Sequence, residues 1–289
     1  MNAIDVDGDN AVEHDGNNEL TFNNPVSSAD SLRYGGGDGI IKDGVNSAYA
    51  IYVSPDGDDS NDGKTSQNAV KTISHAVNLA YDYTGEVILL QGTFIENNIT
   101  LGSSGEISIT GEGNVVIDGN GSENSIFIIH EGQAKFNNIK FINNNPSYGG
   151  AIFMNAGSGT SRDIIDIDVS VENCTFENLK TKRGAAIYAW YTQGNLNIAN
   201  SNFYNMEVSQ WGAGICVGYS QNLNVEITNS RFENNKANNG AGAYLHASAV
   251  TITDSLFNNN SASYDSGAVY LYNATSTIDN CTLTNNVGG

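Results

Sequence analysis

Basic residues and proline are scarce in this chain of 289 residues. It contains 12 Lys and Arg against 32 Asp and Glu, a formal net charge of −20, and only three Pro. A non-specific nucleic-acid binder needs a basic face, which so few cations cannot form, and an anionic membrane surface would repel the chain. The sequence also lacks any run of about 18 apolar residues, so we expect no segment that inserts into a membrane.

Asparagine is abundant instead, with 42 copies, whereas the charge is uneven. Residues 1–63 hold 13 acids and two bases, which places −11 of the net charge there. Residues 1–48 also lack a sustained apolar period, and we interpret them as an acidic leader or linker, loosely packed or poorly ordered. We expect residues 49–289 to form the folded domain.

A repeat of 25–35 residues governs the second half of the chain. Its anchors are Phe141, Phe176, Phe203, Phe232, Phe257 and Leu283. Asn follows each anchor by two positions, Asn or Asp precedes it by three, and Phe, Val or Ile precedes it by five. About eight residues after each of the first five anchors comes a strand start rich in Gly and Ala.

This pattern predicts an all-β, single-stranded parallel β-helix, because each unit is too short to bury its own apolar face and stacked units bury a continuous core. Coils stacked at about 4.8 Å place equivalent residues above one another. We expect the anchors and the residues five before them to point inward. The Asn three before each anchor should occupy a left-handed bend and bond the next coil through its amide.

The Gly/Ala-rich strands alternate between two faces. Residues such as Ile187 and Ile215 should point inward, which leaves Phe153, Tyr188, Cys216, Tyr244 and Tyr270 outside, beside Asn155, Trp190, Gly218, His246 and Tyr272. One interpretation is that these rings only stack on each other and stabilise the coils. The other is a binding platform formed by Tyr188, Trp190, Tyr244, His246, Tyr270 and Tyr272, because exposed aromatic area is typical of recognition surfaces.

The front of the domain differs from the repeats. Val70, Ile73, Val77 and Ala80 recur at helical spacing, with Ser66 or Asn68 as the expected N-cap. A solenoid must cover the open apolar end of its first coil, and one amphipathic helix can do so. We therefore expect residues 49–95 to form an N-terminal cap and residues 96–289 to form the coils.

Two motifs carry a resemblance that covers residues 51–289. Residues 52–94, YVSPDGDDSNDGKT…AVKTISHAV…GEVILLQGTF, resemble the N-terminal cap of right-handed parallel β-helix proteins of the pectate-lyase-like superfamily. The repeats resemble the GGA[I/V/L] and FxxN motifs of chlamydial polymorphic membrane proteins, although Leu179 and Met206 break FxxN. The combination is most similar to adhesin-like surface proteins of methanogenic archaea. The resemblance implies an extracellular, cell-surface protein that binds glycans or surface proteins of other cells.

Related β-helices also include polysaccharide lyases and glycosidases, which need paired carboxylates. The best candidates are Asp166 and Asp168, two apart on one predicted strand, near Arg162 and Asp163. An exposed, solvated strand explains the same residues, and we expect no catalysis. A passive structural stalk is a further alternative.

A calcium-like loop lies before the predicted helix. Asp56, Asp58, Asp59 and Asp62 form the densest group of oxygen ligands, but Ala69 stands where the closing Glu of a calcium loop would be. A structural calcium is the only cofactor that the sequence suggests, and an exposed turn is the alternative.

The three cysteines are expected to be free. Cys174 and Cys281 occupy the same slot of the repeat four coils apart, about 19 Å at 4.8 Å per coil, well beyond disulfide reach. The chain ends at Gly289, where a new small-residue strand should begin, so we expect it to be part of a longer protein.

Overall fold

The computed structural model describes residues 50–81, 85–155 and 165–289, together with four short strands nearer the start of the chain. Contacts divide the chain into two units, Met1–Ala48 and Tyr49–Gly289. In the first unit the strands β1 (Asp5–Val6), β2 (Val12–His14), β3 (Leu32–Tyr34) and β4 (Ile40–Ile41) form one sheet in that order. The prediction that residues 1–48 are loosely packed or poorly ordered concerns residues that lie outside the described ones.

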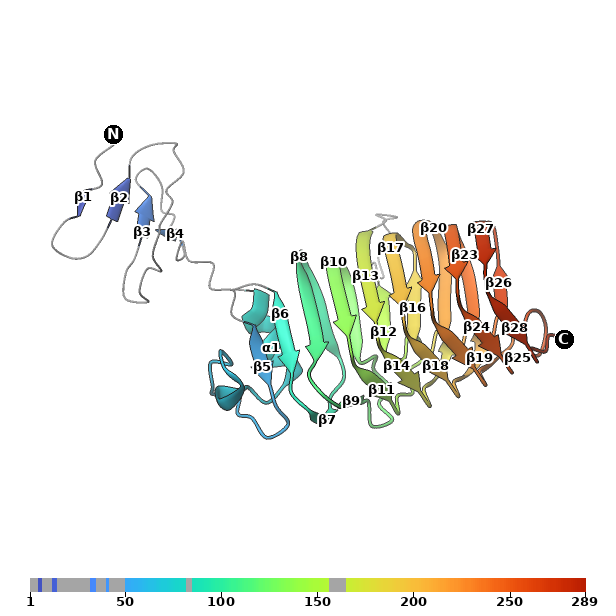
Figure 1. The fold of residues 1–289 in the computed structure, drawn as a ribbon, viewed down its shortest axis with the longest axis horizontal. Helices are drawn as coiled ribbons and strands as arrows, with labels where there is room; N and C mark the ends of the chain where they lie inside the picture. Colours follow the sequence, from blue (N-terminus) through green and yellow to red (C-terminus); the bar gives the residue numbers. More distant parts are fainter. Residues whose placement is uncertain are drawn as a thin grey trace. The chain divides into compact units, whose positions relative to one another are not determined.

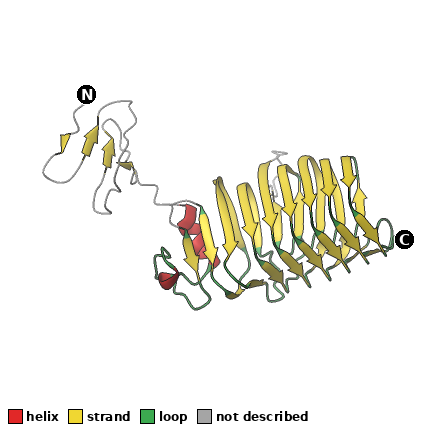
Figure 2. Cartoon of the chain, in the orientation of Figure 1, coloured by secondary structure: helices red, strands yellow, loops and turns green. Residues whose placement is uncertain are grey.

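The second unit is a parallel β-helix of about seven turns, in which every strand pairing is parallel (Figures 1 and 2). The largest sheet consists of β5 (Ile51–Val53), β6 (Glu86–Leu89), β8 (Ile99–Gly111), β10 (Phe127–Asn137), β12 (Ile152–Asn155), β13 (Ile165–Glu172), β16 (Ile187–Trp190), β17 (Thr192–Ala199), β20 (Ile215–Thr228), β23 (Ala243–Thr253), β26 (Val269–Leu271) and β27 (Thr275–Asp279). The predicted fold class is confirmed.

Two further sheets complete each coil. The sheet of anchor strands consists of β7 (Gly92–Ile95), β9 (Val115–Asp118), β11 (Lys140–Ile142), β14 (Thr175–Glu177), β18 (Asn202–Tyr204), β21 (Arg231–Glu233), β24 (Leu256–Asn258) and β28 (Thr282–Thr284). The smallest consists of β15 (Lys180–Arg183), β19 (Glu207–Trp211), β22 (Lys236–Ala237) and β25 (Ser261–Ala262). The strand β8 is 13 residues long.

The anchor phenylalanines stack inside the coils. Phe141, Phe176, Phe203, Phe232 and Phe257 are at most 1% exposed, and neighbouring rings lie 4.4–4.9 Å apart with interplanar angles of 2–12°. Small residues begin the next strand because these rings pack on them. A Cβ added at Gly242, for example, would lie 2.8 Å from Cδ1 of Phe257. The inward positions are therefore as predicted, except in the last coil, which has one neighbouring coil and where Ile278 is 44% and Leu283 51% exposed.

Left-handed corners flank every anchor strand. The twelve Asn and Asp residues two after and three before the anchors all have φ between 46° and 59°. These φ values confirm the predicted bend. Asn recurs there because it tolerates this conformation better than other side chains with a Cβ. The predicted amide ladder is present in part. Asn229 Nδ2 donates to Asn200 Oδ1 at 2.7 Å, which joins two predicted ladder positions. Asn173 Nδ2 donates instead to Asn137 at 3.0 Å, and Asn137 is not one of these positions.

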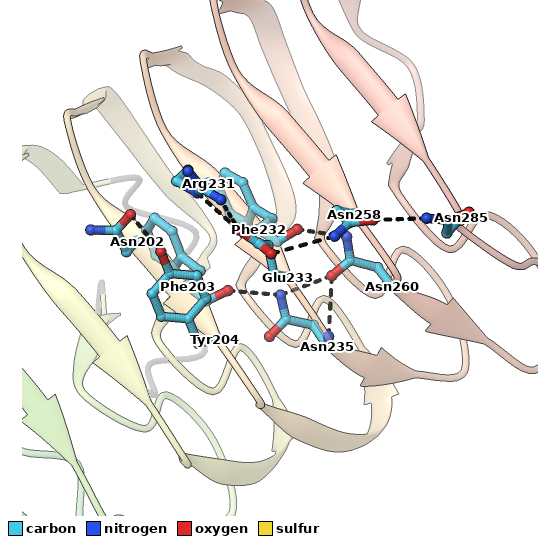
Figure 3. A network of polar contacts seen from close by, with 10 residues as sticks. All are labelled: Asn202, Phe203, Tyr204, Arg231, Phe232, Glu233, Asn235, Asn258, Asn260 and Asn285. Atoms are coloured by element: carbon cyan, nitrogen blue, oxygen red, sulfur yellow. Dashed lines mark hydrogen bonds and ion pairs between the residues drawn. The ribbon is translucent and has the colours of Figure 1, made fainter.

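A second, buried amide column runs beside the phenylalanines (Figure 3). Asn260 Nδ2 donates to the Phe232 carbonyl at 2.8 Å, and Asn260 Oδ1 accepts from the backbone N–H of Asn235 at 3.1 Å. Asn235 repeats this pattern one coil earlier, donating to the Phe203 carbonyl at 3.0 Å. Each amide thereby bonds a backbone N–H and a backbone carbonyl at the turn after the anchor strand.

The helix α1 (Ile73–Tyr81) packs on the first coils against β5, β6 and β8, and buries Ile73, Ala76, Val77 and Ala80. The capping helix is confirmed, but the predicted N-cap is wrong. Ser66 and Asn68 lie in a separate 3₁₀ turn, η1 (Ser66–Asn68). No described helix is long and apolar enough to cross a membrane.

The first N–H groups of α1 are bound by carboxylates from distant segments. Glu96 accepts from the backbone N–H of Ile73 and of Ser74 at 2.8 Å, and Asp59 accepts from those of Lys71 and Thr72 at 2.8 Å. Unpaired N–H groups at a helix start need such partners. No local sequence pattern could reveal them.

Candidate functional site

An aromatic column follows the outer face of β12, β16, β20, β23 and β26. The strand register places Phe153 beside Tyr188, Tyr188 beside Cys216, Cys216 beside Tyr244, and Tyr244 beside Tyr270. The predicted register is confirmed. Tyr244 and Tyr270 stack with ring centroids 5.1 Å apart and an interplanar angle of 8°. The rings therefore line up along the solenoid axis on its outer surface.

Trp211 fills the gap that Cys216 leaves in this column. It ends β19, and its ring stacks on Tyr244 at 5.2 Å and lies 6.5 Å from Trp190. Cys216 itself is buried, and burial raises the pKa of its thiol, so it packs as a small residue. The alternation of the Gly/Ala-rich strands did not predict Trp211, because Trp211 belongs to a different strand of the coil.

Arg183 lies against the same rings. Its Cζ atom is 4.0 Å from the ring centroid of Trp211 and 5.0 Å from that of Trp190. Its Nε donates to Gln210 Oε1 at 2.6 Å, which fixes the guanidinium. A cation above an indole face is attracted by the ring quadrupole, and this guanidinium thereby links rings of two sheets.

The full set, which we name the aromatic cluster, extends beyond the predicted residues to rings from bends and from neighbouring strands. It consists of Tyr148, Phe153, Tyr188, Trp190, Tyr191, Trp211, Tyr219, Tyr244, His246, Tyr270 and Tyr272, with Arg183 among them. The strand alternation gives no prediction for Tyr148, which forms an isolated bridge to Arg183, for Tyr191, which lies at a bend, or for Tyr219, which lies at the register shift of β20.

Tyr188 lies beneath its neighbours. It is only 3% exposed, and the rings of Tyr148, Phe153 and Trp190 lie 5.2–5.7 Å from its own. Burial raises the pKa of its hydroxyl, which therefore stays protonated at neutral pH. Tyr188 supports the exposed rings rather than offering a face itself.

Trp190 lies flat because its neighbour in register has no side chain. A Cβ added at Gly218 would be 2.1 Å from the Trp190 ring atom Cζ3, so any other residue would displace the indole. After Val217, β20 shifts its register against β23, and the shift brings Tyr219 within 5.4 Å of His246. A bulge of this kind re-aims a side chain.

Two tyrosines of the cluster hold a strained backbone. Among the described residues 17 non-glycine residues have positive φ: fourteen are Asn, one is Asp, and the other two are Tyr191 (φ 53°) and Tyr219 (φ 52°). Their rings stack at 5.4 Å and are 54% and 50% exposed. The left-handed region costs a bulky residue about 1–2 kcal/mol. Strain and exposure thus coincide on the same two rings.

The cluster surrounds a pocket of 440 Å³. Its walls are formed by Trp190, Trp211, Tyr219, Tyr244, His246 and Tyr272. His246 is 5% exposed, and burial lowers its pKa, so the imidazole is neutral at pH 7. Its Nε2 is buried without a hydrogen-bond partner. Such an unpaired atom costs about 1–3 kcal/mol, which a ligand hydroxyl could recover.

Comparison with known families locates the repeats that carry this cluster. Residues 185–289 match the right handed beta helix region family. The matched part of the β-helix spans β16 to β28 and holds most of the aromatic cluster. Neither the curated proteins nor the solved structures gave a match.

The candidate catalytic carboxylates lie elsewhere on the β-helix. Asp166 and Asp168 share one face of β13, since a Cβ added at Gly194 would lie 2.8 Å and 3.0 Å from their respective Oδ1 atoms. Asp168 Oδ1 also accepts from Asn195 Nδ2 at 2.8 Å. Arg162 and Asp163 lie outside the described residues. A catalytic role for this pair stays a prediction.

The acidic loop before α1 uses its carboxylates in turns. Asp58 Oδ1 accepts from the Ser60 N–H at 2.9 Å and Asp62 Oδ1 from the Lys64 N–H at 3.2 Å, and these hydrogen bonds lower the pKa of both groups. Asp59 binds the start of α1, and Asp56 is exposed. In the described residues no three His, Cys, Asp or Glu side chains lie close enough to hold a metal. Calcium at this loop stays a prediction.

All three cysteines are free, as predicted. Cys174 is buried, and burial raises the pKa of its thiol to about 12. Its backbone N–H donates to Ser201 Oγ at 3.2 Å, and Ser201 N–H in turn donates to Ser230 Oγ at 3.2 Å. Cys174 therefore starts a column of small polar residues and has no nucleophilic character.

Proposed function

We propose that this β-helix is an extracellular, adhesin-like surface protein that binds carbohydrate through the aromatic cluster. The fold occurs in surface proteins and in pectate lyases, so the fold alone does not choose between binding and catalysis. The choice of carbohydrate binding rests on the chemistry of the cluster.

The strained tyrosines carry the proposal. Among the described residues, every other non-glycine residue with positive φ is Asn or Asp, and only Tyr191 and Tyr219 place a ring in this conformation. Both residues are about half exposed, so the strained backbone conformation buries little aromatic surface. Backbone strain that the fold does not require is typical of binding and active sites.

Aromatic faces suit sugars. The C–H face of a pyranose ring packs on an indole or phenol ring, and the sugar hydroxyls bond nearby polar groups. Trp190 and Tyr191 lie on one coil, Tyr219 on the next and Tyr272 two coils further along, and these rings offer aromatic surface along the axis. Because coils repeat along the axis, the cluster suits a chain of sugar units better than a single one.

The test uses the intact chain on a glycan array, followed by calorimetry with cellohexaose, mannohexaose, xylohexaose and trigalacturonic acid. Trp190→Ala removes the ring that contacts Tyr188, Tyr191, Trp211 and Tyr219, and we expect binding to fall about 30-fold, as for a hot-spot residue of about 2 kcal/mol.

The matched control is Tyr264→Ala. Tyr264 is 67% exposed and lies outside the aromatic cluster, so its loss should leave binding unchanged. Binding that survives Trp190→Ala would place the site elsewhere. A chain that binds no glycan on the array would favour the passive stalk, and release of shortened or unsaturated products would favour an enzyme at Asp166 and Asp168.

A further inference from the structure

We propose that the pocket beside His246 is a subsite for one uncharged pyranose ring, whose hydroxyl pairs with His246 Nε2. This inference rests on the proposed function and assigns it a ligand class and a polar contact. It concerns one place in the aromatic cluster, whereas the proposed function concerns the cluster as a whole.

The pocket has the size and walls of a small-molecule site. Its 440 Å³ lies in the range of about 300–1,000 Å³ that is common for ligand pockets. Five rings of the cluster line it together with His246, which contacts Tyr219 and Tyr272: Trp190, Trp211, Tyr219, Tyr244 and Tyr272. Gly218 also lines the pocket, and its lack of a side chain leaves room for the Trp190 indole.

His246 supplies the polar contact. Its ring packs 5.4 Å from Tyr219 and edge-on to Tyr272 at 4.8 Å, which fixes its plane. Nε2 is buried and unpaired. A sugar hydroxyl both donates and accepts, so it can pair with this nitrogen in either tautomer of the neutral imidazole. Tyr272 is 46% exposed and packs edge-on against His246, so binding through the buried Nε2 requires Tyr272 to move aside.

The walls select an uncharged ligand. None of the residues that line the pocket is Lys, Arg, Asp or Glu. The nearest described cation of the cluster, Arg183, is already stacked on Trp211 and bonded through Nε to Gln210. The chain also carries −20 net charge, which disfavours a carboxylated sugar.

The experiment follows the ¹⁵N shift of His246 Nε2 in the intact chain during titration with the methyl glycosides of glucose, galactose and mannose, and with galacturonic acid. At least one neutral glycoside should move the Nε2 resonance, and galacturonic acid should not. Tighter binding of galacturonic acid would overturn the assignment of an uncharged ring.

His246→Phe supplies the second readout. The variant keeps the ring between Tyr219 and Tyr272 but removes Nε2, so the hexasaccharide that the wild type binds should bind about tenfold more weakly. The melting temperature should not fall, because the unpaired buried nitrogen is gone.

The two proposals fail separately. If no neutral glycoside moves Nε2 and His246→Phe binds the hexasaccharide like the wild type, while Trp190→Ala does not, the subsite is refuted and the proposed function stands. If the intact chain binds no glycan at all, the proposed function is wrong and the subsite falls with it.

Discussion

Two aromatic columns run along this β-helix, one inside and one outside, and they differ in regularity. The inner column repeats one residue type, with interplanar angles of at most 12° between Phe141 and Phe257. The outer column mixes Phe, Tyr, Trp and His, takes Trp211 from another sheet, and includes the edge-on pair of His246 and Tyr272 at 86°.

The difference shows where coil stacking fixes the type and angle of a ring and where it leaves them free to vary. Inside, successive coils offer the same space, so the same ring at nearly the same angle fills five successive positions, from Phe141 to Phe257, at crystal-like density. Outside, a ring meets solvent on one side, and no such constraint fixes its identity. The irregular outer rings, with strain at Tyr191 and Tyr219, therefore point to a role other than holding the coils together.

The largest loss of stability is expected for a substitution in the inner column. Phe232→Ala removes a ring that is fully buried between Phe203 and Phe257 and leaves a cavity, so the free energy of unfolding should fall by about 3–5 kcal/mol. Tyr244→Ala is the outer counterpart. It loses two stacked neighbours but opens to solvent, and should cost about 1–2 kcal/mol. Urea unfolding followed by circular dichroism measures both.

Equal costs for Phe232→Ala and Tyr244→Ala would contradict this contrast. The outer column would then stabilise the coils as strongly as the inner one, and its irregularity would need no functional explanation.

A smaller effect is expected for the buried amide column. Asn235 Oδ1 accepts from the Met206 N–H at 3.1 Å and Nδ2 donates to the Phe203 carbonyl at 3.0 Å. Asn235→Ala leaves the buried Met206 N–H without this acceptor and removes one hydrogen bond from the Phe203 carbonyl, which should cost about 2–3 kcal/mol. The adjacent Asn234 is exposed, and Asn234→Ala should cost only about 1 kcal/mol through its left-handed backbone. Equal unfolding midpoints for the two variants would rule out the buried bonds as the cause.

The sequence predicts the inner column far better than the outer one. Anchors, inward positions and left-handed corners recur in every coil, so their spacing alone revealed them. Arg183 and Trp211 end paired strands of the smallest sheet, whose positions the repeat motifs do not include, and Tyr191 lies at a bend between two strands. The carboxylates of Asp59 and Glu96 bind α1 from distant parts of the chain, which only the folded coils bring together. The repeat therefore predicts the fold, and the deviations from it form the candidate site.

The smallest change in stability, and the sharpest contrast with binding, is expected at the strained corners. Tyr191→Asn and Tyr219→Asn should each leave the free energy of unfolding within about 1 kcal/mol of the wild type, because the relief of left-handed strain offsets the lost ring contacts. Glycan binding should nevertheless fall at least tenfold, measured by calorimetry with the hexasaccharide that the wild type binds.

The Ala variants separate strain from contact. Tyr191→Ala loses the same ring contacts as Tyr191→Asn, but Ala tolerates the corner less well than Asn, so it should be less stable by about 0.5–1 kcal/mol. Asn205→Tyr is the reverse exchange, at a corner with φ 53° outside the aromatic cluster, and should destabilise by about 1 kcal/mol without any gain in binding. If Tyr191→Asn and Tyr219→Asn bind glycan as the wild type does, the strain at these corners serves no recognition, and the outer column is structural after all.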